Sequence, residues 1–314
     1  MTPRKRICHV TSNLSQSLFL EAVGKYVDKE KYDQEFVILG DHPGRLFQRL
    51  SAAGFKTHFI EFRWPHDTAV AIRELAKHLR SRKVDIVHTH LVQPSLIGLL
   101  AGLFARVKCR VHTRHHGSEC HRYFPRGVYY DRLINRLSHK IMAITNVVGE
   151  TLTETEKVPR DKVRVINYGY DLSKFLSSDE AVEDLKRKYK LSTNYPVIGA
   201  VSRFVHWKGV QFIIPAFAAI SVEFPEAKLV LANAVGAYSD EIEELLEQYL
   251  RPDQYVRIPF EAEIFALYRT FDVFVHVPID RELEAFGQTY IEPLYLGVPS
   301  VFTLSGIAND FIRA

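Results

Sequence analysis

Cysteine is scarce in this chain, which has only three among its 314 residues: Cys8, Cys109 and Cys120. The number is odd, and no two of them form a Cys-x-x-Cys pair. Such a set does not read as a disulfide framework and suits a reducing compartment. We therefore expect a cytoplasmic protein.

Long apolar runs are also missing. The longest, around residues 96–104, is about half of the ~20 residues that a membrane-spanning helix needs. The basic start at Arg4, Lys5 and Arg6 is not followed by the apolar stretch of a signal peptide. The sequence predicts neither a membrane span nor a secretory signal.

The common glycine-rich nucleotide motifs are absent as well. The chain has no Walker loop and no Gly-x-Gly-x-x-Gly fingerprint, and the lack of the latter argues against a dehydrogenase. No solenoid repeat and no low-complexity tract occurs. The composition, 46% apolar and 25% charged, is that of an ordinary globular protein.

What the sequence does contain is a regular alternation of short apolar runs and helical patterns, such as the helix at 67–82 that Asp67 can cap. This alternation indicates parallel sheets covered on both faces. We predict an α/β protein with two Rossmann-like domains, residues 1–178 and 179–314. Strands are expected at 6–10, 35–39, 84–89, 109–113, 140–145, 163–166, 197–201, 228–232, 255–258, 273–277 and 300–302.

The net charge of +4 is divided unevenly between these two domains. Residues 1–178 hold 29 Lys and Arg against 17 Asp and Glu, a net charge of +12, and residues 179–314 hold 12 against 20, a net charge of −8. This asymmetry favours an anionic partner for the first domain. The alternative is a solvated charged surface with no partner.

Two glutamates flank a Phe-Gly turn directly after a predicted buried strand. Glu284 and Glu292 enclose Phe286, Gly287 and Gln288, where we expect a helix to begin. The N–H groups of a helix start favour phosphate. A carboxylate repels phosphate, so the two glutamates should serve hydroxyl groups, one on a sugar and one on a ribose. The alternative is that both are ordinary surface residues of a helix.

A second loop follows the predicted strand 197–201. Arg203 and Lys208 lie five residues apart, ahead of Gly209, which opens a helix. An arginine fork and a lysine ammonium group at this spacing can converge on a diphosphate.

Together these two loops resemble the family-4 glycosyltransferases of the GT-B fold, in which two Rossmann-like domains face each other across a cleft. The segments 85–90 (Asp-Ile-Val-His-Thr-His) and 167–175 (Asn-Tyr-Gly-Tyr-Asp-Leu-Ser-Lys-Phe) are similar to two further motifs of that family, the second with an inserted tyrosine. The resemblance covers essentially the whole chain.

The family resemblance implies a retaining transfer of a sugar from a nucleotide-diphosphate sugar to a hydroxyl acceptor, without a metal ion or other cofactor. It implies that Arg203 and Lys208 hold the donor diphosphate, that Glu292 binds the ribose and that Glu284 lies beside the transferred sugar. Backbone groups near Ile258 and Pro259 are expected to hold the base.

An active-site histidine is expected in the segment 111–121. The spacing from Thr113 selects His115, whereas alignment on His-Gly selects His116, and we predict His115. One rival interpretation is a metal site, for which His115, His116, Cys120 and His121 are possible ligands. A missing second ligand pair argues against it, so we predict no metal. A second rival is a set of plain structural or surface histidines.

Arginines alternate with aromatic residues between positions 122 and 132. Arg122, Arg126 and Arg132 could contact an anionic membrane or a charged acceptor. No nucleic-acid motif accompanies them, so we expect no nucleic-acid partner. Leu133, Ile134 and Leu137 are expected to pack inward. The prediction is a peripheral protein on the inner face of a membrane, acting on a lipid-linked acceptor or a cell-surface polysaccharide precursor.

Three departures from the family pattern leave rival functions open. The loop at 11–17 lacks the paired glycines, a Gly-x-Gly-Pro-like turn is missing after 228–232, and the sequence stops soon after 305–310, where most relatives continue. An apolar surface should then be exposed on an incomplete second domain, with weak coupling between domains and low activity. The rivals are a nucleotide-sugar epimerase of the same fold and a sugar-nucleotide-binding protein that has lost catalysis.

Overall fold

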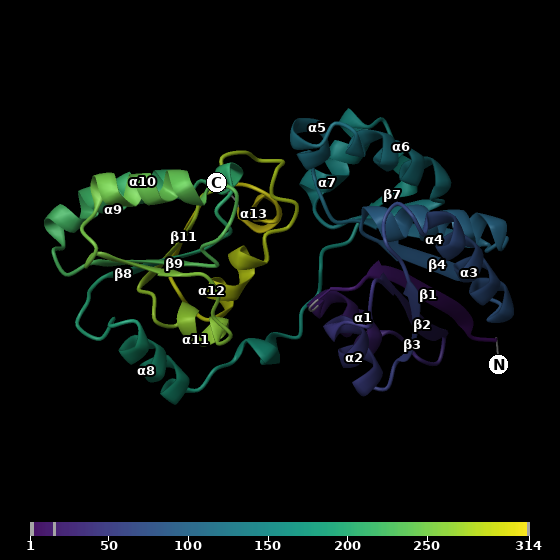
Figure 1. Ribbon diagram of the computed structural model, residues 1–314, viewed down its shortest axis with the longest axis horizontal. Coiled ribbons are helices and arrows are strands. Elements are labelled where there is room, and N and C mark those ends of the chain that lie inside the picture. Colours follow the sequence, from purple (N-terminus) through teal and green to yellow (C-terminus); the bar gives the residue numbers. More distant parts are fainter. Residues whose placement is uncertain (1–2, 15–16, 313–314) are drawn as a thin grey trace. The chain divides into compact units, whose positions relative to one another are not determined.

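The computed structural model describes residues 3–14 and 17–312, and the chain divides into two compact α/β units, Met1–Tyr170 and Asp171–Ala314 (Figure 1). The predicted domain boundary lay at residue 178. Phe175 stacks on Phe265, with ring centroids 4.6 Å apart, and contacts Tyr295 edge-on. These contacts attach the segment before residue 178 to the second unit.

The first unit is built on a seven-stranded parallel sheet in the order β3-β2-β1-β4-β5-β6-β7. Six of its strands were predicted. The seventh, β3, was missed because its only adjacent apolar residues are Phe59 and Ile60, of which Ile60 alone is fully buried. The strands are β1 Lys5–Ser12, β2 Tyr32–Gly40, β3 Lys56–Glu61, β4 Ile86–His90, β5 Cys109–Arg114, β6 Lys140–Ala143 and β7 Val163–Val165.

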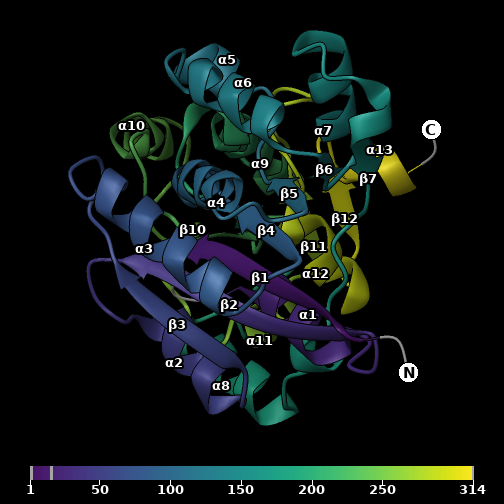
Figure 2. The ribbon, with the colours of Figure 1, turned by 90° about the vertical axis from the view of Figure 1, so that its right-hand side faces the viewer.

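Helices cover both faces of this sheet, as the alternation predicted (Figure 2). On one face α3 and α4 pack on a core that includes Val10, Val37 and Leu75, and on the other α1 and α2 enclose Phe36 and Ile38. The helices are α1 Leu18–Tyr26, α2 Arg45–Ala52, α3 Thr68–Ser81, α4 Val92–Phe104, α5 Glu119–Tyr123, α6 Gly127–Leu137 and α7 Asn146–Glu150, which continues as a π-helix over Thr151–Thr155.

The predicted cap of α3 is wrong in one respect. Asp67 occupies the N-cap position, but its side chain makes no hydrogen bond to the helix. The carboxylate instead accepts a hydrogen bond from the backbone N–H of Arg63, at 2.8 Å. This aspartate therefore closes the preceding turn.

The second unit has a five-stranded parallel sheet in the order β10-β9-β8-β11-β12, and all five strands were predicted. Helices α9 and α10 cover one face, while α8 and α11 cover the other. The strands are β8 Val197–Val201, β9 Lys228–Ala232, β10 Tyr255–Ile258, β11 Val273–His276 and β12 Ser300–Phe302. The helices are α8 Asp179–Lys188, α9 Val210–Glu223, α10 Ser239–Tyr249, α11 Ile264–Tyr268, α12 Ile291–Tyr295 and α13 Ala308–Phe311.

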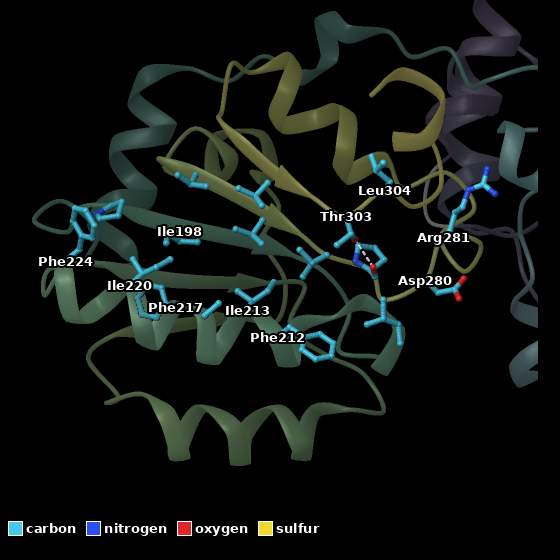
Figure 3. A pocket seen from close by; sticks show the side chains of 18 residues that line it. Ile198, Phe212, Ile213, Phe217, Ile220, Phe224, Asp280, Arg281, Thr303 and Leu304 are labelled. Atoms are coloured by element: carbon cyan, nitrogen blue, oxygen red, sulfur yellow. Dashed lines mark hydrogen bonds between the residues drawn. The ribbon is translucent and has the colours of Figure 1, made fainter. Parts of the chain in front are cut away.

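The second unit carries an apolar groove of about 890 Å³ (Figure 3). It lies between α9 and strands β8, β11 and β12, and its lining includes Phe212, Ile220 and Val301. The Phe212 side chain is 60% exposed and that of Val301 56%. The groove therefore leaves apolar side chains of this unit accessible to solvent. Within residues 3–14 and 17–312, every helix falls short of the length and apolarity that crossing a bilayer requires.

Candidate functional site

The loop after β8 places two cations at the carboxyl end of the second sheet. It runs from Ser202 through a 3₁₀ turn, His206–Lys208, to Gly209, where α9 follows. Gly209 has a φ of +75°, and a Cβ there would collide with the carbonyl oxygen of Val277. Only glycine allows the loop to lie this close to the end of β11. The carboxyl edge of a parallel sheet is where ligands bind in such folds.

The two cations of this loop differ in their surroundings. Arg203 is exposed and has no ion-pair partner within the described part of the chain. Lys208 is half-buried, and its ammonium group is ion-paired with the carboxylate of Glu284. The guanidinium of Arg203 is therefore directly available to an anion, whereas the Lys208 charge is already shared.

Glu284 is a half-buried carboxylate with two basic neighbours. Its Oε2 lies 3.6 Å from Nε2 of His276, the last residue of β11, and contacts Lys208. Burial alone would raise the pKa of Glu284, but the Lys208 charge and the nearby His276 ring outweigh it and lower the pKa to about 2. Glu284 is therefore ionised at neutral pH and can accept hydrogen bonds from hydroxyl groups but cannot donate a proton.

The helix expected to begin near Phe286 starts later. Residues 284–287 are irregular, a 3₁₀ turn spans Gln288–Tyr290, and α12 follows. Gly287 has a φ of +78°, which a helix does not allow, and this conformation displaces the helix start. Any N–H groups offered to a phosphate here come from a short turn at Gln288.

Glu292 lies in α12 and is enclosed by protein donors. Its two oxygens accept hydrogen bonds from the Tyr268 hydroxyl and from Nε2 of Gln288, both at 2.6 Å. Burial raises the pKa of Glu292 against the effect of these two hydrogen bonds. Each carboxylate oxygen has a second lone pair, so the residue is oriented and can still accept from a further hydroxyl group.

The two residues predicted near the base are placed differently. Ile258 is 2% exposed and belongs to the core of the second unit, and its carbonyl oxygen accepts a hydrogen bond from the Ala234 N–H at 3.2 Å. Its side chain points inward from β10, and the contact of backbone groups near Ile258 and Pro259 with a base stays a prediction. Pro259, the next residue, is exposed.

In the first unit, His115 stands at the end of a row of hydrogen-bonded rings. Its Nε2 lies 3.2 Å from Nδ1 of His90, whose Nε2 lies 3.4 Å from Nδ1 of buried His9. The other ring nitrogen of His115 is hydrogen-bonded to the Tyr168 hydroxyl, which belongs to the tyrosine inserted in the motif at 167–175. Burial, with a smaller contribution from His88 and His116, lowers the pKa of His115 to about 3. This imidazole is neutral.

His116 faces a different environment. Its Nε2 lies 3.0 Å from Oδ2 of the buried Asp131 in α6. Asp131 is also ion-paired, at 2.9 Å, with Arg114, a fully buried guanidinium that contacts the Glu156 carboxylate as well. Glu156 accepts further hydrogen bonds from Asn135 and His121. His116 therefore belongs to a buried network that ties α6 and the π-helix to β5.

The four possible metal ligands do not gather at one point. The ligand atoms of His116 and Cys120 lie within 4.8 Å of each other and of Asp131, but His115 points to His90 and His121 points to Glu156. The predicted rival set is therefore not assembled. Asp131, which completes the smaller group, already neutralises Arg114.

The segment 122–132 forms an exposed surface over α5 and α6. Arg122, Arg126 and Arg132 are exposed together with Phe124 (57%) and Tyr129 (70%), and these five residues are called the α5–α6 surface below. Of the three residues expected inside, Ile134 is buried and Leu137 is half-buried. Leu133 is 41% exposed, so its inward packing was wrongly predicted. It lies on the same outward side of α6.

Comparison with known proteins supports the same assignment for both units. The model of Glycosyltransferase Family 4 matches residues 22–174, and that of Glycosyl transferases group 1 matches residues 181–314. The chain belongs to the family-4 glycosyltransferases, a family of transferase enzymes with the GT-B fold.

Individual relatives of this glycosyltransferase are distant. EpsF of Bacillus subtilis, named as a glycosyltransferase, is 24% identical over 96% of the chain and 79% of its own length. Mannosylfructose-phosphate synthase of Agrobacterium fabrum is 27% identical over 58% of the chain, which spans only 41% of that protein. The crystal structure of HepE from Anabaena with UDP and glucose superposes with a TM-score of 0.80 at 17% identity, covering 99% of the chain and 84% of HepE.

Several residues of the glycosyltransferase that shape these sites were not predicted. His276 could have been noticed, because it is a polar residue at the end of an apolar strand. Tyr268 and Arg114 gave no such signal, since their partners lie 24 and 42 positions away in the sequence. Tyr168 was noticed only as an insertion, and its contact with His115 depends on the fold.

Proposed function

We propose that this chain catalyses the retaining transfer of a sugar from a nucleotide-diphosphate sugar to a hydroxyl acceptor. The observation that carries the proposal is the meeting of two loops at the carboxyl end of the second sheet. There Lys208, from the loop after β8, contacts Glu284, from the loop after β11, with Arg203 exposed close by in sequence. HepE, which shares the fold, was crystallised with UDP and with UDP-glucose.

The donor diphosphate is assigned to Arg203, Lys208 and the turn Phe286–Gln288. Arg203 and Lys208 stabilise the negative charge that develops on the departing nucleotide diphosphate. We expect no metal ion and no other cofactor to be needed, because these two side chains supply positive charge. Lys208 is ion-paired with Glu284 before the donor binds. When the donor is bound, Lys208 can contact a phosphate and Glu284 can accept a hydrogen bond from a sugar hydroxyl.

The sugar and ribose hydroxyls are assigned to the two glutamates. Glu284 is ionised, so it accepts hydrogen bonds from the transferred sugar, and Glu292, oriented by Tyr268 and Gln288, accepts from the ribose. His115 is neutral and acts through a hydrogen bond near the sugar. The acceptor hydroxyl attacks from the face that the diphosphate leaves, and the proton passes to the leaving phosphate.

The acceptor is proposed to be a lipid-linked molecule or a precursor of a cell-surface polysaccharide. The α5–α6 surface, with its arginines and aromatic rings, supports attachment to an anionic membrane from the cytoplasmic side. Two relatives are named alpha-monoglucosyldiacylglycerol synthase and capsular polysaccharide biosynthesis glycosyltransferase CapH, which fits both kinds of acceptor.

Calorimetric titration with UDP, GDP and ADP, and with their sugars, tests the donor site. We expect Arg203→Ala to weaken diphosphate binding by about 10- to 100-fold, because a charge-assisted contact contributes about 1.5–3 kcal/mol. Arg251→Ala is the control, since Arg251 is an exposed arginine of the same unit, paired only with Asp253 among the described side chains. Equal binding by wild type and Arg203→Ala would place the donor elsewhere.

Turnover of the best-bound donor then separates three activities. A transferase consumes donor faster when acceptor hydroxyls are added. A nucleotide-sugar epimerase interconverts the donor with no acceptor present, and a binding protein does neither. Donor binding without turnover in any acceptor mixture would therefore contradict the proposal.

A further inference from the structure

A polar pocket opens at the carboxyl ends of β1, β2 and β3 in the first unit, and the three histidines of the row, His9, His90 and His115, are not among the residues that line it. Its volume is about 620 Å³, within the ~300–1,000 Å³ of small-molecule sites. The walls come from the segments that follow the three strands and from the start of α2 and α4. This is the edge of a parallel sheet at which ligands bind.

Positive charge dominates the pocket lining. Arg45 and Arg63 both line it, together with one acidic side chain, Asp41, whose Oδ1 lies 2.7 Å from Nδ1 of His42. Arg63 shares its guanidinium weakly with Glu61 (3.8 Å) and Asp67 (3.5 Å). Arg45 has no ion-pair partner in residues 3–14 and 17–312. The lining therefore holds two guanidinium groups against one carboxylate, and the Arg45 guanidinium can pair with a bound anion.

The position of Arg45 in α2 breaks a local rule. It is the first residue of the eight-residue helix Arg45–Ala52, where the helix dipole disfavours a cation. The preceding N-cap is Gly44, which supplies no side-chain acceptor, and the first turn contains no acidic residue. A bound anion would complement both the helix start and the Arg45 guanidinium. Rules of local sequence are broken in this way mainly at functional sites.

The pocket wall is held in place without a ligand. The Asn13 side chain donates a hydrogen bond from Nδ2 to the His42 carbonyl oxygen, at 2.9 Å. Gly40 and Gly44 pack against Asn13 so closely that a Cβ at either position would collide with its side chain. The segments after β1 and β2 are therefore fixed to each other, which reduces the ordering cost of binding.

We propose that this pocket binds a phosphate-bearing hydroxylated molecule, with the phosphate at Arg45, Arg63 and the start of α2. Trp64 and Gln93, which also line the pocket, contact the remainder of the molecule through a ring face and an amide. That the bound molecule is the glycosyl acceptor rests on the proposed function, whereas the binding itself does not. The class of ligand is a phosphomonoester of a sugar or polyol, free in solution or as a lipid headgroup.

Fluorescence of Trp64 gives a local measurement of this binding. The chain has two tryptophans, Trp64 and Trp207, so the full-length W207F variant reports on the pocket alone. Inorganic phosphate, fructose 6-phosphate and fructose are titrated with UDP present in excess, so that donor-site cations are occupied. We expect both phosphates to change the emission saturably, the sugar phosphate at lower concentration, and fructose to have little effect.

Variants in the W207F background test the assigned cations. Arg45→Ala should weaken phosphate binding by about 10- to 100-fold, and Arg63→Ala by less, because Arg63 already has acidic neighbours. The control is Arg73→Ala, an exposed arginine of α3 outside the pocket. Equal weakening by Arg45→Ala and Arg73→Ala, or no saturable response to either phosphate, would overturn the proposal.

Two further arms separate the ligand sources and the two proposals. Vesicles of phosphatidylcholine with phosphatidic acid replace the sugar phosphate, and Arg45-dependent quenching by these vesicles but not by fructose 6-phosphate would assign a lipid headgroup. UDP binding is measured separately in Arg45→Ala and should be unchanged. A chain that binds phosphate at Trp64 but never binds UDP would refute the proposed function and leave the pocket assignment intact.

Discussion

The two units differ in the charge of the side chains at the carboxyl ends of their strands. In the first unit, burial lowers the pKa of His88 to about 4 and that of His115 to about 3, so these two imidazoles are neutral. In the second unit, Lys208 and Glu284 are both ionised and in contact. The strand ends of the first unit can therefore form hydrogen bonds through uncharged imidazoles. Those of the second unit can form ion pairs and hydrogen bonds with a charged donor.

The same contrast separates two kinds of ion pair. The first kind is fully buried and joins the side chains of Arg114, Asp131 and Glu156. The second kind joins Lys208 and Glu284, whose side chains are 14% and 13% exposed. A buried pair resists separation because an uncompensated charge would remain without solvent. The Arg114 network is therefore structural, and the Lys208 pair can rearrange.

The largest effect should follow removal of Arg114. Arg114→Met would leave two buried carboxylates, and removal of one partner of a buried ion pair costs about 3–5 kcal/mol. We expect a fall of that size in the free energy of unfolding by urea, followed by far-UV circular dichroism. Arg132→Met, on the exposed side of α6, should change it by about 0.5 kcal/mol or less. Equal stability of the two variants would show that the network is not structural.

Removal of the neutral histidine should come next. His115→Ala should reduce sugar transfer about 10²–10³-fold, if its hydrogen bond stabilises the transition state, and leave donor binding little changed. His116→Ala is the paired variant, because its partner Asp131 belongs to the structural network. We expect His116→Ala to lower the free energy of unfolding, and to leave the rate of sugar transfer per folded molecule little changed. A damaging His116→Ala and a silent His115→Ala would reverse the assignment of the active-site histidine.

The charged pair makes a prediction about pH. The pKa of Glu284 falls from 4.5 to about 2 on folding, so ionisation stabilises the fold above pH 4.5, and this contribution is lost as pH falls towards 2. A shift of this size corresponds to a contribution on the order of 3 kcal/mol. Glu284→Gln should therefore flatten the pH dependence of urea unfolding between pH 4.5 and 2. An unchanged pH dependence in this variant would show that Glu284 is not held ionised by Lys208 and His276.

How much of this could be read from the sequence depends on the range of the contacts. Both parallel sheets were predictable, because most strands contain a short run of apolar or β-branched residues between polar turns. Strand β3 was not predicted, because its only adjacent apolar residues are Phe59 and Ile60. The Arg203–Gly209 and Glu284–Glu292 loops were visible as local motifs. The direct contact between the two loops, from Lys208 to Glu284, was not visible, because 76 positions separate these residues in the sequence.

The roles of some residues depend on their surroundings in the fold and could not be predicted from the motifs. His115 and His116 are adjacent and chemically identical, and only the fold directs one to His90 and the other to Asp131. Ile258 was chosen for its backbone at a strand end, and the fold adds that its side chain packs in the core of the second unit. The left-handed conformation of Gly287 moved a helix start that the residue pattern placed earlier.

The smallest effect per residue is expected at the α5–α6 surface, because its three arginines are exposed and attraction between exposed charges is weakened by solvent. Each Lys or Arg near an anionic leaflet contributes about 1 kcal/mol, so Arg122→Ala, Arg126→Ala and Arg132→Ala should each weaken vesicle binding by about fivefold. Binding should rise with anionic lipid content and fall with salt, because screening acts over about 8–10 Å. Sedimentation with anionic vesicles at low salt measures it.

The control for this surface is Arg187→Ala, an exposed arginine of α8 in the net-negative second unit, which should leave vesicle binding unchanged. Replacing Arg122, Arg126 and Arg132 together by Glu should release the protein from vesicles without loss of donor binding, since the donor residues lie in the other unit. If the wild-type protein stays in the supernatant at low salt, the positive charge of the first unit serves a soluble acceptor. The pocket at Arg45 would then be the stronger candidate for the place where this positive charge binds the acceptor.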